Sequence, residues 1–214
     1  MIVDNASTDD TRAFFEGGPT YGFALTYVRC EANLGFSRAN NLGAAKGIGD
    51  FLLFLNNDTI AMPGWLEAMV RVATSSPKVG IVGIQQLFPY TNRIHHTGIV
   101  FTAAKTPQHI YPHADASLPY VNHEREYQAV TGACLLIGRQ LFDEVQGWDE
   151  GYRNGYEDID LCCKVRARGR TVMCCTSAFI YHYGQISETR TLDDDENARL
   201  FATRWASTIQ ADDF

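Results

Sequence analysis

Phe51-Leu52-Leu53-Phe54-Leu55-Asn56-Asn57-Asp58 is an unbroken apolar run that ends in three polar residues. The run has the length of a strand, and the absence of alternation is typical of a strand buried on both faces. Such strands occur in sheets that helices cover on both sides. Asp58 stands just past the carboxyl end of the expected strand, at the edge where open α/β sheets bind ligands. The stretch therefore predicts an α/β fold with a ligand site at this edge.

Strand-like and helix-like segments alternate on both sides of this run. The first strand is expected at Ile2-Val3, and the first helix from Ser7 to Phe15, before two glycines. The alternation predicts a mostly parallel sheet flanked by helices. Segment 88–125 has weak periodicity and is expected to form loops and short strands. Further strands are expected at 25–28, 79–84, 98–101, 133–137, 171–175 and 178–181, and helices at 38–46, 65–73, 139–145, 159–168 and 193–209.

The composition limits the class of protein. The 214 residues, 45% of them hydrophobic, are enough for one sizeable core and fewer than two ordinary domains need. The net charge is −7 and basic residues are scattered, which argues against a nucleic-acid partner. Apolar runs are far shorter than the ~20 residues that span a bilayer, and no signal peptide is evident. We therefore expect a single-domain, soluble and cytoplasmic protein.

The cysteines predict no metal site or redox motif. Two adjacent pairs are present, but the C-x-x-C spacing of zinc sites and redox motifs is not. We expect reduced thiols in the core. The residues are Cys30, Cys134, Cys162, Cys163, Cys174 and Cys175.

Three acidic residues crowd the segment Gly155-Tyr156-Glu157-Asp158-Ile159-Asp160-Leu161, where a loop is expected to become a helix. Helix N-termini stabilise carboxylates through exposed N–H groups and the helix dipole. The cluster therefore fits either a catalytic base facing a cleft or ordinary helix capping. Asp58 and His182 leave similar alternatives, because each follows an expected strand: Asp58 also suits a turn, and His182 a satisfied core histidine.

Taken together, these segments resemble the family 2 glycosyltransferases with the GT-A fold, especially rhamnosyltransferase-like enzymes. The matching segments follow the family's order from Met1 to about Ser187. They are Val3-Asp4-Asn5-Ala6-Ser7, Asn56-Asn57-Asp58, Glu157-Asp158-Ile159-Asp160-Leu161 and Ile180-Tyr181-His182.

The resemblance implies a Rossmann-like, mixed and mostly parallel sheet in one domain, 1–214. Within it, 1–100 would be the nucleotide-binding half, 101–190 the acceptor and catalytic half, and 191–214 a C-terminal helix. Family members normally carry a β-α unit of about 30 residues before the segment that here begins at Val3. The chain is therefore expected to be truncated at its N-terminus, and strand exchange or a homo-oligomer would cover the exposed sheet edge.

The resemblance also assigns roles to individual residues. Asp158 would be the catalytic base, with Glu157 beside it and Asp160 structural. Asp58 and His182 would bind the metal. Asp4 would accept a hydrogen bond from the nucleotide base, although an Asx turn is its alternative, and Trp148 would contact sugar unless it belongs to the core. The remaining residues are Asn5, Ser7, Asn33, Gly35, Asn40 and Asn57 for the nucleotide, and Thr131, Gly132, Ala133 and Asp149 for the donor-sugar and acceptor side.

The activity implied by the resemblance is inverting, metal-dependent transfer from a UDP- or dTDP-sugar to a saccharide or lipid-linked acceptor in surface polysaccharide synthesis. Oxygen ligands suit Mg²⁺ or Mn²⁺, and the imidazole of His182 favours Mn²⁺. Peripheral contact with a membrane would be compatible with a lipid-linked acceptor. The alternative is a catalytically impaired nucleotide-sugar-binding or assembly module. The adjacent His95 and His96 are left out of the site, because neighbours on a strand face opposite sides.

Overall fold

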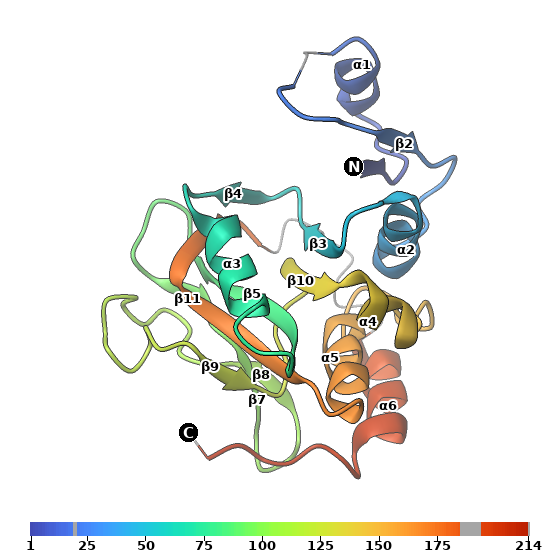
Figure 1. Ribbon diagram of the computed structural model, residues 1–214. Helices are drawn as coiled ribbons and strands as arrows, with labels where there is room; N and C mark the ends of the chain where they lie inside the picture. The colour runs from blue at the N-terminus through green and yellow to red at the C-terminus, as the bar shows by residue number, and fades with distance from the viewer. Residues whose placement is uncertain (19–20, 185–193, 214) are drawn as a thin grey trace.

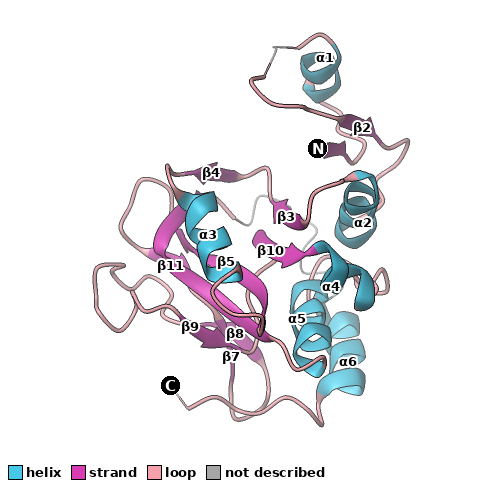
Figure 2. Ribbon diagram, in the orientation of Figure 1, coloured by secondary structure: helices cyan, strands magenta, loops and turns pink. Residues whose placement is uncertain are grey.

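A computed structural model describes residues 1–18, 21–184 and 194–213 (Figures 1 and 2). In this part of the chain a seven-stranded sheet forms the body of the molecule. Its path runs through β3 (Phe51–Leu55), β10 (Cys134–Gly138), β5 (Val79–Leu87), β11 (Thr171–His182) and β4 (Thr59–Ala61), with β6 (Ile94–His96) beside β5 and β9 (Arg125–Tyr127) beside β11.

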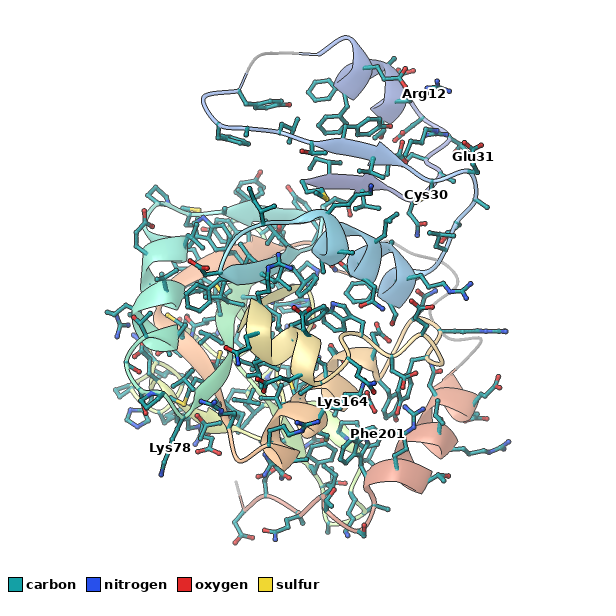
Figure 3. The ribbon with its side chains drawn as sticks, turned by 45° about the vertical axis from the view of Figure 1, so that its right-hand side comes forward. Arg12, Cys30, Glu31, Lys78, Lys164 and Phe201 are labelled. Atoms are coloured by element: carbon teal, nitrogen blue, oxygen red, sulfur yellow. The ribbon has the colours of Figure 1, made fainter. Side chains whose placement is uncertain are left out.

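Two small sheets complete the described strands. β1 (Ile2–Asp4) pairs in parallel with β2 (Tyr27–Arg29), and β7 (Ile99–Phe101) forms an antiparallel hairpin with β8 (Pro107–His109). In Figure 3 the side chains around β1 and β2 lie above α2 (Phe36–Lys46), apart from those that fill the main sheet.

The expectation of a mostly parallel sheet is wrong for the main sheet. There only β5 and β11 run parallel, whereas β10 is antiparallel to β3 and β5, and β4, β6 and β9 are antiparallel to their partners. The apolar pattern of a strand reports which face is buried and carries no information on the direction of its neighbour. The sheet is therefore mixed, as expected, but with mainly antiparallel pairs.

Helices cover both faces of the main sheet. Cys134 and Leu136 of β10 face a cluster that includes Met69 and Val72 of α3 (Trp65–Ala73). Leu135 and Ile137 face the opposite cluster, to which other helices contribute. This alternation follows from the two-residue period of a strand. The helices of the second cluster are α2, α4 (Arg139–Glu144), α5 (Glu157–Ala167) and α6 (Asp194–Trp205).

The apolar run of β3 is not buried on both faces, which corrects the expectation. Leu52 and Phe54 are buried, but Phe51 and Leu55 are 38% and 43% exposed. β3 lies at the end of the strand order, and α3 packs mainly on β5, β10 and β11, with Leu53 of β3 at the margin of their cluster. Phe51 and Leu55 are therefore exposed because α3 covers the middle of the sheet and does not fully cover this edge strand.

Several helix and strand boundaries differ from the expected ones. α1 (Thr11–Glu16) begins four residues after Ser7, because Ser7 N–H donates to Asp4 Oδ1 in a turn that keeps this segment out of the helix. α2 (Phe36–Lys46) begins directly after Gly35, whose φ is 78°. The two strands expected at 171–175 and 178–181 form one strand, β11, with an irregularity between Cys175 and Phe179. The last helix was expected to begin at residue 193, which lies outside the described residues.

The cysteine prediction is confirmed: all six are free thiols and buried. Burial raises the pKa of Cys163 to about 12, so this thiol stays protonated at neutral pH. Among the described helices, none is long and apolar enough to cross a membrane.

Gly83 lets β5 approach the loop before β10. A methyl group at Gly83 would lie 2.8 Å from Cβ of Val130, which is itself fully buried. Carbon atoms in van der Waals contact are about 3.5–4.0 Å apart, so Val130 would have to move. The absence of a side chain at Gly83 is therefore required by packing.

We expect Gly83→Ala to lower the free energy of unfolding by about 1–3 kcal/mol, the usual cost of overpacking a core, measured by urea denaturation. Gly138→Ala is the matched control, because a methyl group there meets nothing within 4 Å. Equal stability of the Gly83→Ala and Gly138→Ala variants would show that this approach is not tight.

Candidate active site

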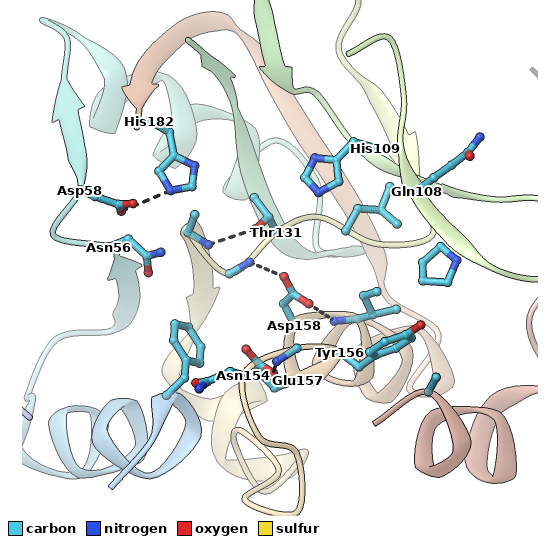
Figure 4. A pocket seen from close by; sticks show the side chains of 18 of the residues that line it. Asn56, Asp58, Gln108, His109, Thr131, Asn154, Tyr156, Glu157, Asp158 and His182 are labelled. Atoms are coloured by element: carbon cyan, nitrogen blue, oxygen red, sulfur yellow. Dashed lines mark hydrogen bonds and ion pairs between the residues drawn. The ribbon is translucent and has the colours of Figure 1, made fainter. Parts of the chain in front are cut away.

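A cavity of about 480 Å³ opens at one end of the main sheet (Figure 4). Loops after β3 and before β10, the start of α5, the end of β11, the β7–β8 hairpin and α6 all contribute to its wall. The lining residues used below are Phe36, Asn56, Asp58, Gln108, His109, Thr131, Gly132, Ala133, Asn154, Gly155, Tyr156, Glu157, Asp158, His182 and Asp195.

Asp58 and His182 come together at the junction of β3, β4 and β11. β4 pairs with the end of β11, which brings His182 opposite Thr59 and beside Asp58. His182 Nε2 lies 3.2 Å from Asp58 Oδ1, and the contact with His182 lowers the pKa of the Asp58 carboxyl below its ordinary value. Asp58 is therefore ionised at neutral pH.

These two atoms have the spacing of two ligands of one cation. The contact does not have hydrogen-bond geometry, and Asp58 Oδ1 and His182 Nδ1 have no hydrogen-bond partner among the described residues. Neighbouring ligand atoms around an octahedral ion, each 2.0–2.1 Å from it, are about 3 Å apart. Within the described residues no third His, Cys, Asp or Glu joins them, so any further ligands would come from amide oxygens, water or a bound diphosphate.

Asp158 is held from two sides by the backbone. Its Oδ1 accepts a hydrogen bond from Ile159 N–H at 2.9 Å, within the first turn of α5, and its Oδ2 accepts one from Gly132 N–H at 2.9 Å, in the loop before β10. Two fixed donors give the carboxylate one orientation, and its exposed edge lines the cavity. The acidic segment is thus both a helix start and part of the pocket.

The loop that leads into α5 has an unusual backbone. Asn154, Gly155 and Tyr156 have φ values of 54°, 149° and 70° in succession. Left-handed conformations of non-glycine residues cost energy and persist where the surroundings fix them. One such contact is the hydrogen bond from Gly155 N–H to Glu157 Oε2, at 2.5 Å. Glu157 therefore shapes the loop that presents Tyr156 and Asp158 to the cavity.

Gly132 permits close packing behind Asp158. A methyl group at this position would lie 3.2 Å from Phe36 and Trp148 and 3.3 Å from Asp158 Cβ. These distances are shorter than ordinary carbon contacts, so a side chain would push Asp158 or the aromatic rings away. The structure brings the predicted Thr131, Gly132 and Ala133 into the same wall as Asp158.

Asp160 lies on the opposite side of α5, fully buried. It accepts a hydrogen bond from Trp205 Nε1 at 2.8 Å and lies 3.1 Å from Lys164 Nζ. The hydrogen bond from Trp205 fastens α6 to α5, and the ion pair with Lys164 lies within α5, which agrees with the structural role expected for Asp160.

Trp148 and Asp149 do not line the cavity, which corrects the prediction that they face the donor-sugar and acceptor side. Trp148 is only 1% exposed and packs edge-on against Phe36 and Phe54. Asp149 binds Arg204 at 2.7 Å, away from the pocket. Asn57 is also exposed outside the cavity, and its neighbour Asn56 lines it instead, because successive side chains after a strand point in opposite directions.

The side chain of Asp4 is occupied within the N-terminal segment. Asp4 is 3% exposed, and its carboxylate accepts hydrogen bonds from Ser7 N–H at 2.7 Å, from Tyr27 and from Arg29. Burial raises the pKa of the carboxyl, but the hydrogen bonds outweigh this effect and hold the pKa well below its ordinary value. Asp4 does not line the cavity, so its contact with a nucleotide base stays a prediction.

The other predicted nucleotide residues mainly shape the entry into α2. Asn5 Nδ2 donates to Asn33 Oδ1 at 2.8 Å, and Asn5 Oδ1 accepts from Leu34 N–H at 2.7 Å. Asn33 Oδ1 also accepts from Gly35 N–H, and Asn40 Nδ2 donates to the Phe36 carbonyl. None of these four predicted residues, nor Ser7, lines the cavity.

The sequence did not point to several residues of the wall. Gln108 and His109 come from the segment with weak periodicity, Asn154 and Asp195 belong to no predicted motif, and Tyr156 received no role although it lies in the acidic segment. Only tertiary packing places the β7–β8 hairpin and α6 beside α5. The concentration of histidines in 88–125 was a sequence signal for this part of the wall, but it did not indicate a role for His109 in particular.

The sequence pattern of "Glycosyltransferase like family 2" matches residues 1–208. The chain is 32% identical over 207 residues to "Uncharacterized protein y4gI" of Sinorhizobium fredii (94% of this chain, 23% of the relative). It is 32% identical over 193 residues to "O-antigen biosynthesis protein RfbC" of Myxococcus xanthus (87% and 15%). The chain therefore spans less than a quarter of either relative.

A further relative is the "N-acetylglucosaminyl-diphospho-decaprenol L-rhamnosyltransferase" of Mycobacterium tuberculosis, 26% identical over 212 residues (86% of this chain, 66% of the relative). Among solved structures, a mannosyltransferase of Pyrobaculum calidifontis with GDP-Man and Mn²⁺ has a TM-score of 0.64 at 16% identity (98% and 55% covered). GalNAc-T7 with UDP, GalNAc and Mn²⁺ has a TM-score of 0.63 at 15% identity (96% and 50%).

The structural likenesses show the fold, and the sequence match shows the family. The central mixed sheet with helices on both faces is that of the GT-A glycosyltransferases. The chain belongs to glycosyltransferase family 2.

Proposed function

We propose that this chain is the catalytic domain of an inverting, metal-dependent glycosyltransferase that uses a UDP- or dTDP-sugar. The observation that carries the proposal is the convergence of Asp58, His182 and Asp158 on one cavity from three distant parts of the sequence. The alternative is an impaired nucleotide-sugar-binding or assembly module. Such a module would have the same fold but would not turn over a donor sugar.

The charges of the cavity support a cation in the site. Four carboxylates line it, those of Asp58, Glu157, Asp158 and Asp195, whereas none of the described lining residues is Lys or Arg. A diphosphate would meet repulsion there unless a divalent ion neutralised it. Asp58 Oδ1 and His182 Nε2 would hold Mn²⁺ or Mg²⁺, and the ion would supply the charge that stabilises the departing nucleoside diphosphate.

The position of Asp158 suits a general base. The acceptor hydroxyl would lie between Asp158 and the anomeric carbon of the donor sugar. As the acceptor oxygen forms its bond to that carbon, its proton passes to Asp158 and the bond to the diphosphate oxygen breaks on the opposite face. Displacement from the opposite face inverts the anomeric configuration. The two backbone hydrogen bonds to Asp158 hold its carboxylate in one orientation for this step.

The acceptor class is proposed from the relatives. One relative is named for O-antigen biosynthesis, and another for a lipid-linked diphosphate acceptor. We infer a saccharide or lipid-linked acceptor in surface polysaccharide synthesis, with the domain acting on the cytoplasmic side of a membrane. A homo-oligomer, which the open edge of β3 would favour, belongs to the same proposal.

Calorimetry with UDP and with dTDP, each with and without Mn²⁺, followed by a donor-hydrolysis assay, tests the proposed function. We expect nucleotide binding that strengthens with Mn²⁺, and hydrolysis of a UDP- or dTDP-sugar. Binding without turnover would favour the binding or assembly module. Failure to bind either nucleotide would contradict both readings.

Asp158→Asn should leave Mn²⁺-dependent UDP binding nearly unchanged and reduce sugar transfer by about 10²–10⁴-fold, because the amide cannot accept a proton. Asparagine has nearly the same shape but keeps only one of the two backbone hydrogen bonds, because its amide nitrogen cannot accept, so retained UDP binding is needed to exclude a folding defect. Asp143→Asn, in an exposed carboxylate of α4, is the control. Full activity of Asp158→Asn would remove this residue from the mechanism.

Asp58→Ala and His182→Ala should each weaken Mn²⁺ binding to the UDP complex by at least about tenfold, measured by calorimetry. Removing a residue that only supports a metal ligand typically lowers metal affinity by about 10–100-fold, so removing a ligand itself should lower it at least as much. His123→Gln, at an exposed histidine outside the cavity, is the matched control. Unchanged Mn²⁺ affinity in both alanine variants would place the cation elsewhere.

A further inference from the structure

The side chain of Asn197 in α6 is paired with the backbone of Arg153. Its Nδ2 donates to the Arg153 carbonyl at 2.8 Å, and its Oδ1 accepts from Arg153 N–H at 3.1 Å. The two residues are 44 positions apart in the chain, and Asn197 is only 2% exposed. Asparagine is a poor helix former, and burying an amide is unfavourable unless it is hydrogen-bonded. The pairing with Arg153 therefore accounts for a buried asparagine at this position of a helix.

Arg153 leads directly into the left-handed loop of the cavity. The next three residues, 154–156, have φ values of 54°, 149° and 70°. The hydrogen bond from Gly155 to Glu157 joins two residues of the same segment, so it fixes the shape of the loop and not its place in the molecule. The pairing with Asn197 ties the start of the loop to a different helix. It therefore sets where the loop lies.

The loop and α6 line the cavity on either side of this pairing. Tyr156 and Asp158 come from the loop and the first turn of α5, and Asp195 and Ala198 come from α6 (Figure 4). Asn197 lies between the two α6 residues in the sequence, and it is not among the described residues of the lining. Its amide therefore joins the two walls from behind the cavity surface.

The place of the loop determines the place of Asp158. The carboxylate of Asp158 accepts a hydrogen bond from Gly132 N–H at 2.9 Å. Asp158 belongs to the first turn of α5, which begins directly after the left-handed loop. If Arg153 were released, the loop and this first turn would shift relative to Gly132. A misplacement of about 1 Å can lower the rate of an enzymatic step by about 10²-fold.

α6 has a second attachment, which does not involve Asn197. α6 lies alongside α5 (Figure 1), and Trp205 Nε1 donates to Asp160 of α5 at 2.8 Å. Arg204 lies 2.7 Å from Asp149. These contacts are about two helical turns beyond Asn197. We therefore expect α6 to stay docked when the amide of Asn197 is removed.

We propose that Asn197 is a positioning residue of the transfer reaction: it holds the loop before α5 through Arg153 and so keeps Asp158 in place to accept the proton of the acceptor. The role does not require Asn197 to touch the donor or the acceptor. The proposal rests on the proposed function, because it needs Asp158 to act as the base.

Amide hydrogen exchange followed by NMR tests the holding role without any ligand. Hydrogen-bonded amides exchange when the structure opens locally. Asn197→Leu keeps much of the volume and removes both bonds to Arg153, so we expect the Arg153 amide to exchange about 3- to 10-fold faster, the worth of one neutral hydrogen bond. Asn197→Asp should have a smaller effect, because its carboxylate still accepts from Arg153 N–H.

Two controls separate local release from general unfolding. The amide of Cys174, in the central strand β11, should exchange at the same rate in every variant. Arg199→Ala, at an exposed residue of the same helix, should leave the exchange of the Arg153 amide unchanged. An equal acceleration at Cys174 and Arg153 in Asn197→Leu would contradict a local role.

Steady-state hydrolysis of UDP-glucose and of dTDP-rhamnose with Mn²⁺ tests the effect on the reaction, with water in the place of the acceptor. We expect Asn197→Leu to lower kcat by about 10- to 100-fold, because Asp158 is misplaced, and to leave the KM of the donor and Mn²⁺-dependent UDP binding nearly unchanged. Asn197→Asp should fall between Asn197→Leu and the unaltered protein. Val72→Ala, in a buried residue of α3 on the opposite face of the sheet, should lower stability and keep kcat.

The outcomes separate this proposal from the proposed function. An unchanged exchange rate of the Arg153 amide in Asn197→Leu, an unchanged kcat, or an equal loss of kcat in Val72→Ala would each overturn the positioning role. If the unaltered protein hydrolyses neither donor, the proposed function is contradicted and the role in transfer with it. The exchange of the Arg153 amide would still decide whether Asn197 holds the loop.

Discussion

Two consecutive backbone N–H groups, those of Thr131 and Gly132, fix the geometry of the pocket. One donates to buried His96 and the next to Asp158. The two donors lie in adjacent peptide units joined at the Cα of Thr131, so the groups that they hold are anchored to one short stretch of backbone. The loop before β10 thereby joins the start of α5 to the β6–β8 side of the molecule. The cavity keeps its shape because its walls share this segment.

The core behind this loop prevents it from moving. Trp148 and Phe36 pack against Gly132 with no room for a side chain, and Phe54 of β3 packs edge-on against Trp148. The apolar run that ends at Asp58 thus supports the peptide that holds Asp158. Functional groups are positioned well when packed neighbours fix their supports. Trp148, for which the sequence predicted contact with a sugar, instead supports the site from the core.

Two of the carboxylates that line the cavity are stabilised by the backbone at the start of α5. Asp158 and Glu157 accept backbone hydrogen bonds around the start of α5, which stabilises their charges. Asp160 and Asp4, by contrast, are matched with cations outside the cavity. The described lining residues of the cavity include four carboxylates and no Lys or Arg, and this acidic lining is what our proposal of a divalent cation beside a bound diphosphate rests on.

The sequence by itself determined the features that depend on near neighbours: the apolar strand before Asp58, the acidic first turn of α5, the buried thiols, and the order of motifs that identified the family. It could not determine the direction of strand pairing, the exposure of Phe51 and Leu55 at the sheet edge, or the burial of Trp148, because these depend on which segments pack alongside. The same holds for His109 and Tyr156, which the β7–β8 hairpin and a left-handed loop bring to the cavity. Local patterns encode burial and helix ends, whereas a site made from distant segments exists only once the chain has folded.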